Sequence, residues 1–230
     1  MVFYNLNYLI YMLTCFILSL ICNIAVKSSF SKYSQIANSR RLTGAQAAQQ
    51  VLSAHGVTGV RIEPVQGNLT DHFDPRTNVI RLSESVYNAA TVSAVGVACH
   101  EAGHAVQHAE GYLPNKIRSA IVPMANFGSR LSWLFLVVGL LLPAKYDFVL
   151  IIGIVLFSLS VLFTLITLPV EFNASNRALK TIKETNMLNP DEYSGAKKVL
   201  SAAAMTYVAA AATSIAQLLR LLMIANNRRR

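Results

Sequence analysis

The first 26 residues contain no charged side chain, and this feature constrains the fold more than any other. At about 1.5 Å per helical residue, the apolar part from Phe3 to Val26 is long enough to cross the hydrocarbon core of a bilayer. A cleavable signal peptide would begin with basic residues and end at a small-x-small site. Residues 1–26 lack the basic start, and no such site follows Ile24, so they predict a retained N-terminal transmembrane anchor.

Two further apolar blocks and the composition also indicate a membrane protein. Hydrophobic residues make up 53% of the 230 residues and charged residues only 13%, a balance too apolar for an ordinary soluble domain. The blocks run from about Met124 to Leu142 and from Phe148 to Pro169. They predict a transmembrane helical hairpin within residues 121–169.

The net charge of +9 comes partly from basic clusters next to the apolar segments. Basic residues at such positions usually hold a chain at a membrane surface. They lack the interleaved aromatic residues and the motifs of nucleic-acid-binding proteins, so we expect a lipid bilayer and no nucleic acid as partner. The clustered residues are Lys27, Lys32, Arg40, Arg41 and Arg228-Arg229-Arg230.

Between the anchor and the hairpin, residues 27–120 predict a small α+β globule. Thr43 can cap a helix that Gly56 ends. The stretches 57–66 and 77–82 have the pattern of two strands, separated by a turn-rich loop. A globule of this size is small for self-sufficient burial, so we expect support from the neighbouring membrane helices.

The next predicted helix, which Ser83 or Ser85 caps and which runs to Ala109, carries the sequence His100-Glu101-Ala102-Gly103-His104. At about 100° per residue, the two histidines lie about 40° apart on one face and can share one ion. The glutamate flanks them and need not bind it. This is the spacing of a hydrolytic zinc site, although a coincidental pair on a solvated helix is the simpler alternative.

A catalytic zinc ion generally has three protein ligands, so two histidines leave the site one ligand short. Glu171 is the better candidate, because the predicted hairpin brings it back towards His104 and it begins a new helix after Pro169. The alternative for Glu171 is a carboxylate that only complements a helix dipole. His108 lies one turn beyond His104, but a rigid helix curves away from the ion, so we expect a surface histidine there.

Residues 170–230 are expected to form the helix that carries Glu171 and then an alanine-rich C-terminal helix with a basic tail. Asn189 and Pro190 start that last helix as its cap and first residue. If it crossed the membrane, it would place Arg228 and the following arginines outside, against the usual charge bias. The sequence therefore favours three transmembrane helices and allows four, in a mainly α membrane protein with a small α+β globule.

Charge asymmetry predicts the orientation of the chain. No basic residue precedes the anchor and four follow it within fifteen residues, so its N-terminus should face outward and the globule the cytoplasm. The hairpin then returns Glu171 to the side that holds His100 and His104. The loop around Lys145 is expected on the outside.

Three segments together resemble the YugP-type neutral zinc metallopeptidases of bacterial membranes. They are His100–His108 (HEAGHAVQH), Leu69–Thr77 (LTDHFDPRT) and Pro169–Ser175 (PVEFNAS). The resemblance covers nearly the whole chain, including the spacing of the apolar blocks. The chain is also similar to the heat-shock membrane protease HtpX, in which a membrane hairpin likewise separates the His-Glu-x-x-His motif from the zinc-binding glutamate.

The resemblance implies a zincin-like globule with His100, His104 and Glu171 as ligands of Zn²⁺ and Glu101 as the catalytic residue. It implies a multi-pass protein of the bacterial inner membrane, with a peptide or protein as substrate. Where HtpX has an aspartate four positions after its ligand glutamate, this chain has Ser175. A carboxylate that orients a zinc-bound histidine is therefore absent or supplied from elsewhere.

The leading hypothesis is a membrane-embedded zinc endopeptidase in which Glu101 is the general base for a metal-activated water. A catalytically silent scaffold or adaptor, braced by zinc, is the alternative. His72 is a candidate donor to the oxyanion, but a residue that stabilises a turn is the simpler expectation. The strand 77–82 could pair with an extended substrate if its edge is exposed. The sequence does not indicate an oligomeric state.

Overall fold

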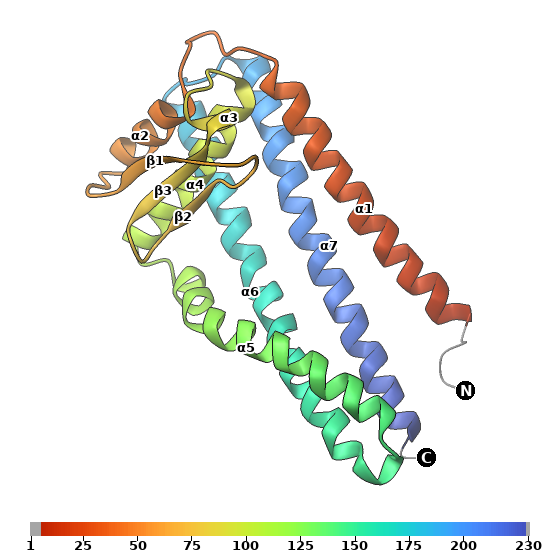
Figure 1. The fold of residues 1–230 in the computed structure, drawn as a ribbon. Coiled ribbons are helices and arrows are strands. Elements are labelled where there is room, and N and C mark those ends of the chain that lie inside the picture. The colour runs from red at the N-terminus through yellow and green to blue at the C-terminus, as the bar shows by residue number, and fades with distance from the viewer. Residues whose placement is uncertain (1–5, 229–230) are drawn as a thin grey trace. The chain divides into compact units, whose positions relative to one another are not determined.

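The computed structural model describes residues 6–228 (Figure 1). Residues 1–5 and 229–230, which include the start of the predicted anchor and the last two arginines of the basic tail, lie outside the described part. Along the chain the elements are α1 (Leu6–Ser34), α2 (Gly44–Ala54), β1 (Arg61–Val65), β2 (His72–Asp74), β3 (Val79–Ser83), α3 (Glu84–Tyr87), α4 (Val92–Ala109), α5 (Leu113–Leu141), a 3₁₀ turn η1 (Ala144–Tyr146), α6 (Asp147–Glu184) and α7 (Pro190–Arg228).

The chain divides into two compact units, which share the long helices. We call them the helical unit, comprising Met1–Ile21, Ile117–Leu168 and Tyr207–Arg230, and the globular unit, comprising Cys22–Lys116 and Pro169–Thr206. The mainly α class with a small α+β part is confirmed.

The first helix of the globular unit confirms the predicted start and stop signals. Thr43 and Gln46 form a capping box, in which the Thr43 side chain accepts from the Gln46 N–H and the Gln46 side chain accepts from the Thr43 N–H. Gly56 follows α2 with a φ of 64°, in the left-handed region that glycine adopts without strain. Local sequence therefore determines both ends of α2.

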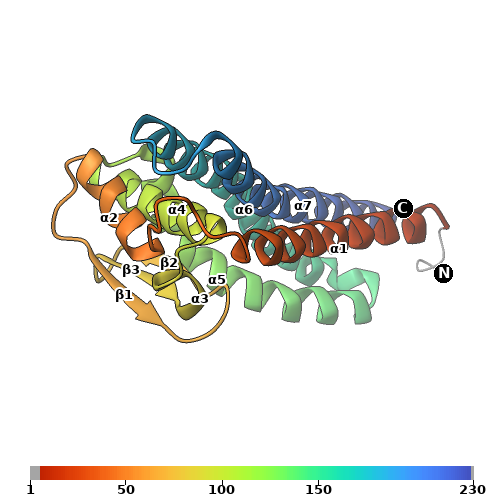
Figure 2. The same cartoon turned by 90° about the horizontal axis from the view of Figure 1, so that it is seen from above.

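The sheet has three strands rather than the two that were predicted, in the order β1-β3-β2 (Figures 1 and 2). β1 is parallel to β3, with Ile62 opposite Ile80, and β2 is antiparallel to it, with Phe73 opposite Ile80. β2 lies in the predicted loop, because three residues are too few to show a strand's alternation. β3 is thus the central strand, and the expectation that its own edge could receive a substrate is wrong.

The predicted helix from Ser83 or Ser85 to Ala109 is interrupted in the structure, where α3 and α4 are separate helices. The carbonyl of Ala90 accepts from the backbone N–H of Asn38 at 3.0 Å, so the chain between the two helices bonds to another segment instead of continuing a helix. Thr91 then caps α4, with its hydroxyl accepting from the N–H of Ala94 at 3.3 Å.

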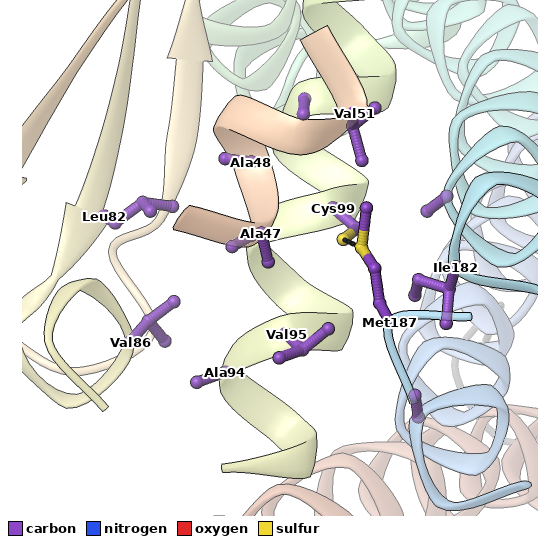
Figure 3. Close-up of a cluster of buried hydrophobic side chains, with 14 of the residues drawn as sticks. Ala47, Ala48, Val51, Leu82, Val86, Ala94, Val95, Cys99, Ile182 and Met187 are labelled. Carbon is purple, nitrogen blue, oxygen red and sulfur yellow. Dashed lines mark hydrogen bonds between the residues drawn. The ribbon is translucent and has the colours of Figure 1, made fainter. Parts of the chain in front are cut away.

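The hydrophobic core of the globular unit lies between α2, α4, the sheet and the parts of α6 and α7 that belong to this unit (Figure 3). Ile182 and Met187 are fully buried against α4, and the Cys99 thiol approaches the Met187 sulfur to 3.9 Å. Each buried side chain of this size contributes roughly 1.5–3 kcal/mol. The long helices therefore supply the support that the small globule was expected to need.

In the helical unit, α5 and α6 form the predicted hairpin around η1. Gly139 on α5 permits close packing, since a Cβ there would lie 2.6 Å from the backbone nitrogen of Leu150 on α6. α6 does not end at Pro169 but continues without a break to Glu184. The expected new helix after Pro169 is therefore wrong, and Glu171 is an interior residue of α6 rather than an N-terminal one.

The end of α7 contacts the hairpin loop. The Arg228 guanidinium lies 3.3 Å from Asp147 at the start of α6 and donates to the carbonyls of Gly139 and Leu142, the latter at the end of α5. These contacts compensate the charge of Arg228 locally. The predicted charge bias considers only which basic residues lie beside a helix, so it could not take such contacts into account. Four helices are long and apolar enough to cross a membrane, namely Leu9–Ser34, Leu113–Leu141, Ala144–Glu184 and Pro190–Arg228.

Candidate metal centre

The two motif histidines lie one turn apart on α4 and face the same neighbour. Their rings are edge to face with centroids 4.7 Å apart, and both side chains are mostly buried. The Nε2 atoms of His100 and His104 point to the same oxygen, Oε2 of Glu171, at 3.3 and 3.4 Å. One ligand atom from each of these three residues lies within 4.8 Å of the others.

Glu171 reaches this position because α6 passes very close to α4. Gly103, inside the motif, has no side chain at the point of contact, and a Cβ there would lie 2.7 Å from the Ala174 carbonyl oxygen. The Glu171 side chain is only 2% exposed, so the carboxylate is withdrawn from solvent and aimed at the histidines. The alternative of a carboxylate complementing a helix dipole does not apply to a residue inside a helix.

The other ring nitrogen of each histidine also contacts a polar side chain. Nδ1 of His100 lies 3.1 Å from the hydroxyl of Ser175, and Nδ1 of His104 lies 3.1 Å from Oε1 of Gln107. Ser175, which stands where HtpX has an aspartate, thus contacts one of the two motif histidines. Gln107 was not predicted, although its position three residues after His104, on the same helix face, was a usable signal.

Glu101 is buried beside the three residues without being one of them. Its Oε2 accepts from the backbone N–H of Phe73 on β2 at 3.1 Å. Burial raises the pKa of the Glu101 carboxyl to about 7, and the charges of Glu171 and Asp71 act in the same direction, against the lowering by His100 and the Phe73 N–H. A carboxyl group with this pKa can accept a proton and return it near neutral pH.

The hydrogen bond between Phe73 and Glu101 also shows where the outer edge of β2 points. β2 pairs with β3 along one edge, and because the Phe73 N–H on the other edge donates to Glu101, this outer edge faces the motif helix α4. His72 precedes it on β2, is exposed, and has its Nδ1 2.7 Å from the Thr70 carbonyl oxygen. This contact agrees with the simpler expectation of a residue that stabilises a turn.

His108 is not part of the cluster. It is exposed near the end of α4, and its ring packs on that of Phe73 with centroids 5.7 Å apart. Among the residues that the structure describes, the group able to hold a metal ion consists of His100, His104 and Glu171.

Two imidazoles and one carboxylate are the ligands that Zn²⁺ takes in many hydrolytic sites. The geometry also favours a cation. Three atoms that can each donate an electron pair, two imidazole nitrogens from α4 and a carboxylate oxygen from α6, converge on one place. The donor set thus fits zinc.

Comparison with known proteins agrees with this chemistry. The family model described as "Putative neutral zinc metallopeptidase" matches residues 8–226. The chain belongs to this family. A curated relative, "Putative membrane protease YugP" of Bacillus subtilis (strain 168), is 48% identical over 212 residues, which are 92% of this chain and 93% of the relative. No solved structure matches the chain.

Membership confirms the resemblance that the three sequence segments carried. Zinc is the metal of this metallopeptidase family, and His100, His104 and Glu171 are positioned as its possible ligands. A protease family also implies a peptide substrate and, with a membrane protease as relative, a membrane environment.

Proposed function

We propose that the protein is a membrane-embedded, zinc-dependent endopeptidase with His100, His104 and Glu171 as metal ligands and Glu101 as general base. The observation that carries the proposal is the second buried carboxylate. Glu101 lies next to the ligand cluster, is held by the Phe73 N–H, and does not belong to the ligand set. A site that served structure alone would gain nothing from a buried base at this place.

The roles follow from the geometry of the side chains. A zinc ion bound by the three ligands would polarise a substrate carbonyl and acidify a water molecule. Glu101 takes one proton from the attacking water and passes it to the nitrogen of the leaving amine, so that the carboxyl ends the cycle ionised. Since Oε2 accepts from the Phe73 N–H, we assign the transferred proton to Oε1.

The outer edge of β2 is the best place for an extended substrate. β2 pairs with β3 on one side, and its other side faces Glu101. A peptide added there would place its backbone next to the general base. β2 therefore takes the substrate-binding role that the sequence suggested for the strand 77–82.

A zinc-braced scaffold without catalytic activity is the competing function. Such structural zinc sites usually close the fourth coordination position with cysteine or histidine. Cys99 is buried against Met187, and His108 packs on Phe73, so neither side chain supports that role. We therefore favour the enzyme.

We further propose that the protein is a multi-pass protein of the bacterial inner membrane, with the site facing the cytoplasm. Basic residues follow the anchor, and a membrane protease is a close relative in sequence. The regions proposed as functional parts are the anchor (1–26), the zincin-like globule (27–120), the hairpin (121–169) and the glutamate-bearing and C-terminal helices (170–230).

Substitution of Glu101 tests the proposal. Glu101→Gln preserves shape but cannot accept the proton, so the purified variant should retain zinc while the appearance of new protein termini in expressing cells ceases. Glu84→Gln, the same change at an exposed site on α3, is the matched control and should behave like the parent. Equal cleavage by Glu101→Gln and the parent would show that Glu101 is not the base.

A further inference from the structure

Gln107 is an uncharged polar side chain in contact with the ligand cluster, and it is fully buried. Its Oε1 lies 3.1 Å from Nδ1 of His104. Its Nε2 donates to the carbonyl of Val170 at 2.8 Å and to Oδ1 of Asn173 at 2.9 Å. One amide therefore contacts a ligand on α4 and two residues that flank the ligand Glu171 on α6.

The direction of these hydrogen bonds is determined by groups that can act in only one way. A backbone carbonyl can only accept, so the end of the Gln107 amide that faces Val170 must be the NH₂ group. Asn173 gives the same result independently. The Arg177 guanidinium can only donate, and its Nε lies 2.7 Å from Oδ1 of Asn173, so that oxygen also accepts from Gln107.

It follows that the other end of the amide, facing His104, is the oxygen. An oxygen can only accept there, so Nδ1 of His104 must carry the proton and donate. The neutral ring then has its lone pair on Nε2, the atom that points to Oε2 of Glu171 at 3.4 Å. The Nε2 lone pair and the carboxylate oxygen then face each other as two electron-pair donors, an arrangement that suits a metal ion bound to both.

For His100, the neighbouring group does not determine which ring nitrogen carries the proton. The Ser175 hydroxyl, 3.1 Å from Nδ1 of His100, can either donate or accept, so it is compatible with both tautomers. A carboxylate, the usual orienting group for a zinc-bound histidine, could not replace the Gln107 amide, because it would bring a negative oxygen against the Val170 carbonyl and Asn173 Oδ1.

We propose that Gln107 is a positioning residue that sets the metal-binding tautomer of His104 and joins the two ligand-bearing helices through one amide. The proposal rests on the metal centre described under the proposed function. It makes Gln107 the counterpart, for His104, of the orienting carboxylate that is missing from this site, and it makes Asn173, together with the Val170 carbonyl, one of two acceptors that keep the amide in the correct direction.

Metal binding by the purified full-length protein tests the proposal without any assay of proteolysis. Gln107→Met keeps the volume of the side chain and removes all three hydrogen bonds. Zinc affinity, measured by competition with a chelating dye, should fall about 10–100-fold. The visible absorption of the Co²⁺-substituted protein should change as well, because the orientation of His104 changes. Gln217→Met in the helical unit is the matched control and should alter neither.

Asn173 provides a second, milder pair of variants in case Gln107→Met does not fold. Asn173→Ala removes one of the two acceptors that direct the amide and should weaken zinc binding by less than Gln107→Met does, whereas Asn173→Asp keeps an acceptor and should bind zinc like the parent. Parental affinity and spectrum in both Gln107→Met and Asn173→Ala would overturn the role of Gln107 alone. Absence of zinc binding by the parent protein would instead overturn the metal centre, and this inference with it.

Discussion

The carbonyl oxygen of Ala174 on α6 lies against Gly103 on α4, so closely that a Cβ on Gly103 would be 2.7 Å away from it. The clash would be with backbone, which cannot rotate away. Gly103→Ala should therefore push the two helices apart at the level of Glu171 and His100. We expect zinc affinity to fall by at least about 10-fold, together with a loss of stability of about 1–3 kcal/mol from overpacking.

Gly96→Ala is the matched control for this prediction, because it makes the same change on the same helix. A Cβ on Gly96 would lie 3.4 Å from the Cβ of Ala196, an ordinary contact. This variant should keep zinc and should unfold at nearly the parental temperature. If both alanine variants bound zinc like the parent, close helix packing would not be what positions Glu171.

Glu171 and His108 can be compared directly as candidate third ligands. Glu171→Ala leaves two histidines and should weaken zinc binding by more than about 100-fold, a larger effect than the loss of an orienting partner. His108→Ala, which removes an exposed ring that packs on Phe73, should leave the metal content nearly unchanged. Metal analysis of both purified variants decides the question, and the reverse result would place all ligands on α4.

The stability of the strand that carries Phe73 should depend on pH through Asp74. Hydrogen bonds from Thr77 and the Arg76 N–H, with the Arg81 guanidinium, lower the pKa of Asp74 to about 2. The unfolded chain has the ordinary value of about 3.9. The ionised carboxyl therefore stabilises the fold above about pH 4, and this contribution is lost as the pH falls from about 4 to about 2.

Asp74→Asn should accordingly unfold at a lower temperature than the parent at pH 7, and the difference should shrink below pH 4. Thermal unfolding in the presence of a chelator measures this without a contribution from metal release. A difference that stays constant from pH 7 to pH 2 would contradict the assigned role of the Asp74 carboxylate.

The contact between Arg228 and Asp147 predicts the side of the membrane on which α7 ends. Cysteines introduced at the exposed positions Lys145 and Asn227 should react alike with an impermeant reagent added to intact cells, while one at Gln49 on α2 should be protected. The three native cysteines are free and buried, so background labelling should be low. Labelling of Lys145→Cys without Asn227→Cys would mean that α7 does not cross the membrane.

Features that depend on neighbours in the chain could be predicted from the residues alone. The capping box of Thr43 and Gln46, the cap of α7 at Asn189 and the helical face shared by His100 and His104 all involve spacings of three or four residues. Local hydrogen bonds and helical geometry set them, and both are encoded in the order of the side chains. The long apolar blocks likewise predicted long helices, because only a bilayer or a thick core accommodates them.

Features that depend on distant segments could not be predicted in this way. α6 runs through Pro169 to carry Glu171 in its interior, and no local pattern indicates whether an apolar helix ends or continues at a proline. The three-residue strand β2 and its Phe73 N–H matter only because they lie beside Glu101. The direction of the Gln107 amide requires the Val170 carbonyl, 63 residues away in the chain, since a hydrogen bond is determined by its partner's position and not by sequence distance.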